Sequence, residues 1–207
     1  MDRLDFARDI SSGMRVLDIG GGLMPGSDEH HPFVVKYRKI RAVAKQYRAV
    51  DCQKKPDVDY VIDFNERGSG DKLGFIIDEY KPDVILCMET LEHVNCHNDI
   101  MRELAGAVRK FGTVVFITIP NNGNWLLNLV KKWRSYHILA FFEDIARNFI
   151  RQSDLGKFDV WQIPCIGNYY WWWRLFYAAS FFQPMSWGFF VQRPGMSIIS
   201  VPWKKIS

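Results

Sequence analysis

The chain has 207 residues, of which 48% are apolar and 24% are charged, and its formal net charge is +4. This length is typical of one full domain, and the composition is that of an ordinary globular protein. A protein that binds polyanions would usually carry denser runs of Lys and Arg, so the mild positive charge does not indicate a nucleic-acid partner.

The cysteines and the first residues bear on the cellular compartment. Cys52, Cys87, Cys96 and Cys165 form no CxxC pair and have neither zinc-site nor disulfide spacing, so we expect buried thiols in a reducing compartment. Residues 1–13 are charged and lack the apolar core of a signal peptide. No stretch reaches the roughly 18 uninterrupted apolar residues of a membrane span. These patterns predict a cytoplasmic protein.

Short apolar runs alternate with helical patterns along the first part of the chain. Residues 71–81 and 98–112 carry apolar residues at helical spacing, Gly112 stands where the second helix would stop, and residues 27–46 should form a helix over their second half. Strands that alternate with helices imply a parallel sheet with right-handed crossovers. The predicted strands are 14–20 (MRVLDIG), 47–52 (YRAVDC), 58–64 (VDYVIDF), 83–89 (DVILCME) and 113–120 (TVVFITIP).

The pattern changes after the fifth strand. Residues 137–152 predict an amphipathic helix, and residues 158–164 and 195–203 resemble strands. Between these strands, residues 169–190 are dense in tryptophan, tyrosine and phenylalanine. Three interpretations stay open: packing over the sheet as the wall of an acceptor pocket, contact with a membrane interface where such residues concentrate, or a dimer interface.

The first strand ends in an aspartate and a run of glycines. Ligands of open parallel sheets collect where loops leave the carboxyl ends of the strands. Asp18 is followed by Gly20, Gly21 and Gly22, and glycine lets a backbone approach a ligand without a Cβ between them and permits positive φ in a sharp turn. This loop is therefore a candidate binding element.

Three further strands also end in residues suited to a nucleoside. Asp51 could accept hydrogen bonds from both hydroxyls of a ribose, Asp63 could accept from an exocyclic amine, and Phe64 could pack on a purine. The G-x-G-x-x-G fingerprint of dinucleotide sites is absent, as is the G-K-[ST] of phosphate loops. The pattern therefore favours a nucleoside without phosphates.

In this order, the strand ends and their flanks resemble the class I S-adenosylmethionine-dependent methyltransferases, in particular the small-molecule branch with an xLEHV signature. The resemblance implies an α/β, doubly wound, Rossmann-like sheet of seven strands whose last strand, 195–203, is antiparallel. Met24 departs from the family's loop, in which a glycine stands at its position, and Gly26 would take that role in a longer turn. The matching segments are VLDIGGG (16–22), AVDC (49–52), VIDFNE (61–66), DVILCMETLEHV (83–94) and RELAGAVRKFGTVVFITIPNN (102–122).

The resemblance also implies roles for individual residues. Asp18, Gly20, Gly21 and Gly22 would lie near the methionine moiety, and Asp51 with Cys52 near the ribose. Asp63 and Phe64 would contact the adenine. Met88 and Glu89 would lie near the sulfonium. Each could alternatively cap a turn or a helix, or lie solvated at a strand end.

Methyl transfer to a hydroxyl benefits from a general base, and histidine titrates in the suitable range. His93 and Glu89 are the predicted catalytic residues. Two alternatives stay open: Glu92 and His93 could simply begin the next helix, or Glu89, Glu92 and His93 could hold a divalent ion with a fourth ligand such as His137. We predict no metal.

These features predict one domain over residues 1–207, with a cofactor-binding half (1–122) and an acceptor-binding half (123–207) that includes an aromatic-rich insertion (167–192). The predicted reaction transfers a methyl group from S-adenosylmethionine to oxygen on a small or lipid-linked acceptor and leaves S-adenosylhomocysteine. Peripheral membrane contact through residues 169–190 and a homodimer are further expectations. The alternatives are an RNA or protein methyltransferase that uses the basic residues of 36–48, and a non-catalytic homologue that binds the cofactor.

Overall fold

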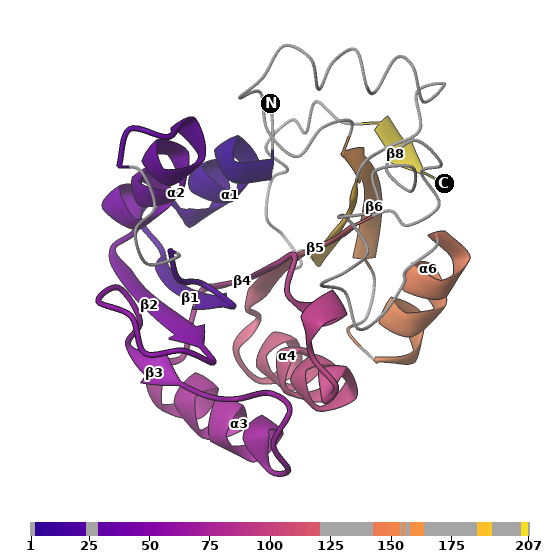
Figure 1. The fold of residues 1–207 in the computed structure, drawn as a ribbon. Helices are drawn as coiled ribbons and strands as arrows, with labels where there is room; N and C mark the ends of the chain where they lie inside the picture. The colour runs from indigo at the N-terminus through magenta and orange to yellow at the C-terminus, as the bar shows by residue number, and fades with distance from the viewer. Residues whose placement is uncertain are drawn as a thin grey trace, which may run out of the picture.

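One mixed β-sheet carries helices on both of its faces in the computed structural model (Figure 1). The strands are β1 (Arg15–Ile19), β2 (Gln46–Asp51), β3 (Tyr60–Val61), β4 (Val84–Met88), β5 (Val114–Pro120), β6 (Phe158–Ile163), β7 (Ser186–Val191) and β8 (Lys204–Ile206). The helices are α1 (Arg3–Ser11), α2 (Pro32–Val43), α3 (Ser69–Tyr80), the short 3-10 helix η1 (Leu91–His93), α4 (His97–Phe111) and α6 (Glu143–Gln152). The structure describes residues 3–23, 29–120, 143–153, 155, 158–163, 186–191 and 204–206.

The strand order is β3-β2-β1-β4-β5-β7-β6-β8. The first five strands in this order pair in parallel, β7 is antiparallel to both β5 and β6, and β8 is antiparallel to β6. This arrangement confirms the α/β, doubly wound, Rossmann-like fold with an antiparallel strand after the parallel ones.

The predicted number of strands is corrected, because the described residues form eight strands instead of seven. The antiparallel strand beside β5 is Ser186–Val191, within the aromatic segment. Residues 195–203, predicted as the final antiparallel strand, lie outside the described residues, so that assignment stays a prediction. Both stretches are apolar runs of strand length, and periodicity alone cannot decide which of two such runs pairs with a given neighbour.

Alternating side chains of the central strands divide the core into two layers. In β5, Phe116 faces the layer beneath α1 and α2, whereas Val115 and Ile117 face the layer beneath α3, α4 and α6. Successive side chains of a strand point to opposite faces, and both faces are covered. This explains why β4 and β5 are continuous apolar runs instead of alternating ones.

The helices predicted within residues 27–112 form, and one of them begins earlier than expected. Helix α2 begins at Pro32, earlier than expected, because proline fits the first turn of a helix, where its missing N–H removes no hydrogen bond. Helix α1 was not predicted, although it packs on the sheet through Phe6, whose ring lies edge-on to Phe116 at 4.9 Å and to Phe190 at 5.2 Å. Of the predicted helix 137–152, residues 137–142 lie outside the described part.

The connection between β2 and β3 contains no helix. It can be short because β3 pairs only at Tyr60 and Val61, so the chain returns just a short distance along β2. Polar contacts hold it in place: Asp59 accepts a hydrogen bond from the Ala49 N–H at 2.9 Å, and Arg48 forms an ion pair with Asp59 at 2.6 Å. The connection therefore crosses the carboxyl edge of the sheet as an ordered loop.

Among the described helices, none combines the length and the apolar character needed to cross a membrane.

Two glycines of α4 should respond oppositely to substitution by alanine. Gly112 ends the helix in the left-handed conformation, with φ 65°, and a side chain there costs about 1–2 kcal/mol. Gly106 lies inside the helix, and a Cβ added to it meets nothing within 4 Å, so Gly106→Ala should add about 0.5–1 kcal/mol through helix propensity. Urea unfolding of both variants measures this, and shifts of the same sign would contradict the assignment.

Candidate active site

A cleft of about 480 Å³ opens at the carboxyl edge of the parallel strands, a volume within the range of small-molecule sites. It is bordered by the ends of β1, β2 and β4 and by the loops that follow β2 and β3. Its lining residues are Gly20, Asp51, Cys52, Gln53, Lys55, Asp63, Phe64, Asn65, Glu89, Thr90, His93 and Val94. The structure therefore brings together seven of the predicted site residues: Gly20, Asp51, Cys52, Asp63, Phe64, Glu89 and His93.

The glycine loop lies close to neighbouring side chains. Gly20 has φ 77°, and a Cβ there would lie 2.2 Å from the Thr90 hydroxyl oxygen. At Gly22, a Cβ would lie 3.0 Å from Asp51 Oδ2. Only glycine fits both positions without displacing a neighbour, so the side chains of Thr90 and Asp51 lie directly against the backbone of the loop.

Asp51 is a buried carboxylate with two partners. Its Oδ1 accepts a hydrogen bond from the Gln53 N–H at 2.9 Å, and its Oδ2 accepts one from the Lys55 ammonium, also at 2.9 Å. A carboxylate has about four acceptor positions. Asp51 therefore keeps acceptor capacity for a ligand in the cleft.

The loop after β3 supplies the next part of the lining. Asp63 Oδ1 accepts a hydrogen bond from the Asn65 N–H at 2.8 Å, and the Asn65 side chain in turn accepts one from the Asn95 N–H at 2.9 Å. Phe64 belongs to the apolar core beneath α3 and α4 and also reaches the cleft. A fixed carboxylate and an aromatic ring thus stand next to each other.

Cys52 also lines the cleft and is exposed, which corrects the expectation that it is buried. Partial burial raises the pKa of the Cys52 thiol, and the negative charge of Asp51 adds to this, so the thiol is not activated as a nucleophile. Of the other cysteines, Cys87 is buried, Cys96 is half-buried, and Cys165 lies outside the described residues.

Glu89 is held by an ion pair from the N-terminal helix. Arg3 of α1 lies 2.8 Å from its carboxylate, and both side chains are largely buried. The backbone of Glu89 is in the left-handed region with φ 52°, unusual for a residue with a side chain. Conformations of this kind persist where the surroundings enforce them, often at functional sites.

Glu92 lies behind His93 and is fully buried, with 0% exposure. Burial raises the pKa of Glu92 well above its ordinary value, and the charge of Glu89 raises it further, which favours the protonated form. His93, which lines the cleft, has its Nε2 3.7 Å from Glu92 Oε1. Within the described residues, no group of three or more His, Cys, Asp or Glu side chains is arranged to hold a metal ion. His137 lies outside them.

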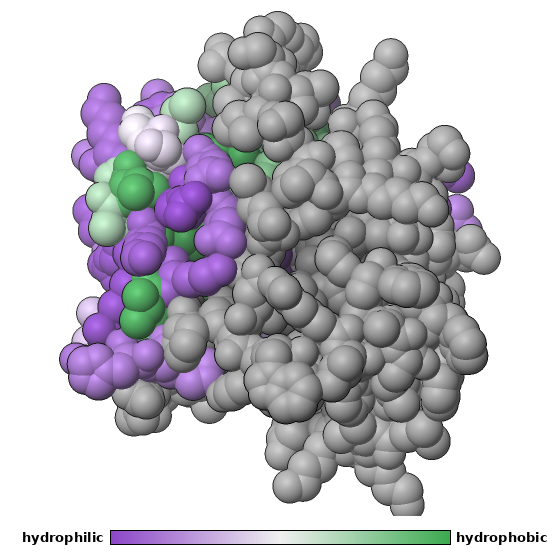
Figure 2. All heavy atoms as spheres, turned by 90° about the horizontal axis from the view of Figure 1, so that it is seen from above, coloured by the Kyte–Doolittle hydropathy of each residue, from purple (hydrophilic) through white to green (hydrophobic). Residues whose placement is uncertain are grey.

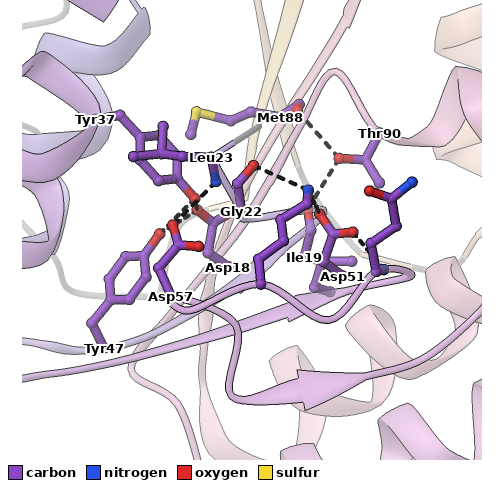
Figure 3. A network of polar contacts seen from close by, with 12 residues as sticks. Asp18, Ile19, Gly22, Leu23, Tyr37, Tyr47, Asp51, Asp57, Met88 and Thr90 are labelled. Atoms are coloured by element: carbon purple, nitrogen blue, oxygen red, sulfur yellow. Dashed lines mark hydrogen bonds and ion pairs between the residues drawn. The ribbon is translucent and has the colours of Figure 1, made fainter. Parts of the chain in front are cut away.

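Four predicted site residues are not among those that line the cleft. Asp18 is buried and accepts hydrogen bonds from the hydroxyls of Tyr37, at 2.6 Å, and Tyr47 (Figure 3). Met88 packs against the apolar layer beneath α1 and α2. Gly21 and Gly22 stand behind Gly20 in the loop, where a Cβ on Gly21 would collide with Asp18 at 2.5 Å. These residues shape the loop from below.

The sequence analysis missed Gln53, Asn65 and Val94 of the lining, and it missed three residues that hold the site together through polar contacts. Thr90 donates a hydrogen bond to the Ile19 carbonyl at 3.0 Å and ties β1 to β4. Arg3 and Lys55 provide the cations for Glu89 and Asp51. Lys55 stands four residues after Asp51, and this spacing was a weak indication in the sequence that the two charges form an ion pair. Nothing in the sequence linked Arg3 to Glu89, because the pair is created by the docking of α1.

The fold and the cleft define an α/β protein with a nucleoside-sized site at the carboxyl edge of its sheet. The chain belongs to the methyltransferase domain family, whose model matches residues 1–158. This match confirms the resemblance to class I S-adenosylmethionine-dependent methyltransferases and identifies the chain as a methyltransferase.

Individual relatives agree with this family. The chain is 28% identical over 147 residues to the ubiquinone biosynthesis O-methyltransferase of Escherichia coli O9:H4 (strain HS), a match that covers 69% of this chain and 59% of the length of that protein. An S-adenosylmethionine-dependent methyltransferase from Archaeoglobus fulgidus has the same fold, with a TM-score of 0.54 at 14% identity over 92% of this chain and 91% of that one. The structure of the small RNA methyltransferase HEN1 matches with a TM-score of 0.55 at 14% identity, over 99% of this chain and 26% of that one.

The buried carboxyl of Asp18 predicts a pH-dependent stability. Burial raises the pKa of Asp18 from 3.8 to about 6, although its two tyrosine hydrogen bonds oppose this shift. The folded protein therefore holds a proton between these values that the unfolded chain has released, so the contribution of Asp18 to stability is lost as the pH rises through about 6. The free energy of unfolding of the wild type, relative to Asp18→Asn, should fall by about 2 kcal/mol between about pH 4 and pH 7.

Urea unfolding of the two proteins over this pH range measures the difference. A difference that does not change with pH would show that Asp18 ionises in the folded protein as it does in the unfolded chain.

Proposed function

We propose that this chain transfers the methyl group of S-adenosylmethionine to an oxygen of a small or lipid-linked acceptor, with S-adenosylhomocysteine as product. The observation that carries the proposal is the meeting of Gly20, Asp51, Phe64, Glu89 and His93 around one cleft. They come from the ends of four strands or from the segments that follow them, so only the folded sheet assembles them.

The residues present fit the adenosyl group. Gly20, which has no Cβ, lines the cleft together with Asp51. Asp51 would accept from the ribose hydroxyls, and Asp63 and Phe64 would contact the adenine. Cys52 and Gly20 would border the nucleoside, while Asp18, Gly21, Gly22 and Met88 would support the loop and strand ends from beneath. When bound, S-adenosylmethionine supplies an electrophilic methyl group.

The protein has to align the acceptor and exclude water. His93 is half-exposed at the cleft and close to Glu92, so it is placed to take a proton from an acceptor hydroxyl. Glu89 is fixed by Arg3 at the same end of the cleft and would orient the acceptor. Methylation at oxygen is supported by the distant E. coli relative, which is a ubiquinone biosynthesis O-methyltransferase.

The basic residues proposed for an RNA acceptor are largely engaged within the protein. Lys36 forms an ion pair with Asp5 at 2.9 Å, and Arg48 forms one with Asp59 at 2.6 Å. Arg41 donates to a backbone carbonyl. These contacts support a solvated, internally paired face and favour a small acceptor over a polyanion.

The described surface gives limited support to a membrane interface. In Figure 2, the part of the surface formed by described residues is mainly hydrophilic. Its exposed large apolar side chains, Val35, Val43, Val61 and Phe75, are distributed over α2, β3 and α3. Most of residues 169–190 lie outside the described part, and Phe189 and Phe190 are buried in the core. The expected membrane contact through residues 169–190 therefore concerns mainly residues outside the described part.

Asp51→Asn should weaken binding of S-adenosylhomocysteine by about tenfold or more, because charged hydrogen bonds to the ribose contribute about 1.5–3 kcal/mol. Isothermal titration calorimetry measures the affinity. Asp78→Asn removes an exposed carboxylate on α3 that pairs with Lys110 and is the matched control. Equal affinities of Asp51→Asn and the wild type would place the nucleoside elsewhere.

The acceptor class is tested by transfer of a labelled methyl group into a cell lysate that is then separated into lipid, small-molecule and RNA fractions. We expect label in the lipid or small-molecule fraction, and turnover reduced by about 10²-fold or more in His93→Asn with affinity for S-adenosylhomocysteine unchanged. Label in RNA would overturn the proposed acceptor, and cofactor binding without any transfer would identify a non-catalytic homologue.

A further inference from the structure

Lys55 is a buried lysine at the wall of the cleft. It is only 6% exposed, and its ammonium lies 2.9 Å from Asp51 Oδ2 and 3.4 Å from the Gly22 carbonyl oxygen. Lysine is rarely buried to this degree unless its charge is paired. The arrangement therefore places a fixed cation between the carboxylate proposed for the ribose and the backbone of the glycine loop.

The loop that carries Lys55 also holds the glycine loop at other points. Asp57 accepts a hydrogen bond from the Leu23 N–H at 3.1 Å, and Val58 lies where a Cβ on Gly22 would collide with it at 2.9 Å. Figure 3 shows Gly22, Leu23, Asp51 and Asp57 grouped at this edge of the sheet. The β2–β3 connection, which contains no helix, thus supports the glycine loop directly.

The two hydrogen bonds of Asp51 fix the orientation of its carboxylate. The Gln53 N–H holds Oδ1 and Lys55 holds Oδ2, so the remaining acceptor positions have a set direction. Without Lys55, a buried negative charge would lose its counter-ion and one of two anchors, and the carboxylate could turn or move away from the cleft. Ligand binding would then include the unfavourable free energy of ordering the Asp51 carboxylate.

We propose that Lys55 is a positioning residue for the cofactor: it orients Asp51 toward the ribose hydroxyls and joins Asp51 to the glycine loop. This inference rests on the proposed binding of the adenosyl group in this cleft. It assigns to Lys55 an action through Asp51 and not through contact with the amino-acid end of the cofactor.

Two probes separate these modes of action. S-adenosylhomocysteine has both the adenosyl group and the amino-acid end, whereas 5′-methylthioadenosine has the adenosyl group, including the ribose, but lacks the amino-acid end. Lys55→Met should weaken the binding of both probes by the same factor, about tenfold or more, because the lost contact acts on the part that they share. Lys54→Met, at the exposed neighbouring lysine, is the control and should bind both probes as the wild type does.

Calorimetry well below the thermal midpoint of each variant measures affinities that a loss of stability alone would not change. Equal affinity of Lys55→Met and the wild type would overturn the proposal, as would a loss confined to S-adenosylhomocysteine. If Lys55→Met does not fold, Lys55→Arg and Lys55→Gln decide: Arg keeps the charge and should bind both probes more tightly than Gln, whereas equal affinities would overturn the proposal. Failure of the wild type to bind either probe would instead reject the proposed function.

Discussion

The close approach of β1 and β4 at the carboxyl edge of the sheet is the constraint on which the site depends. Thr90, two residues after the end of β4, donates a hydrogen bond from its hydroxyl to the Ile19 carbonyl at 3.0 Å and occupies the space where a side chain on Gly20 would lie. The chain must therefore turn through a left-handed glycine. This turn exposes the backbone of the glycine loop and sets the depth of the cleft beside Asp51.

Charge is organised in two pairs around this turn. Lys55 neutralises Asp51 on the side of β2, and Arg3 neutralises Glu89 on the side of β4. Glu92, which lies deeper, has no such cation at hydrogen-bond distance within the described residues, and burial raises its pKa. The cleft can therefore present two oriented carboxylates. Asp51 is held by Lys55 from the adjoining loop, and Glu89 is held by Arg3 from the N-terminal helix.

Much of the site followed from local patterns. Asp51 and Glu89 were predicted because apolar runs identify parallel strands, and the carboxyl ends of such strands meet at one edge. Asp18, which also follows an apolar run, is not among the residues that line the cleft. Its side chain points to the face covered by α2, where Tyr37 and Tyr47 take up its carboxylate. A strand end in the sequence does not show which face a side chain will meet.

The sequence by itself determined the parallel half of the sheet, the covering helices α2, α3 and α4, and the edge where a nucleoside would bind, because hydrophobic periodicity and glycine placement are local properties. Only the tertiary structure decided that Ser186–Val191 lies beside β5, that Arg3 reaches Glu89, and that Lys55 joins Asp51 to the glycine loop. These outcomes depend on which surfaces dock and on the charges that are then buried together. These contacts join residues that are far apart in the sequence or that lie in irregular loops. No periodic sequence pattern predicts contacts of this kind.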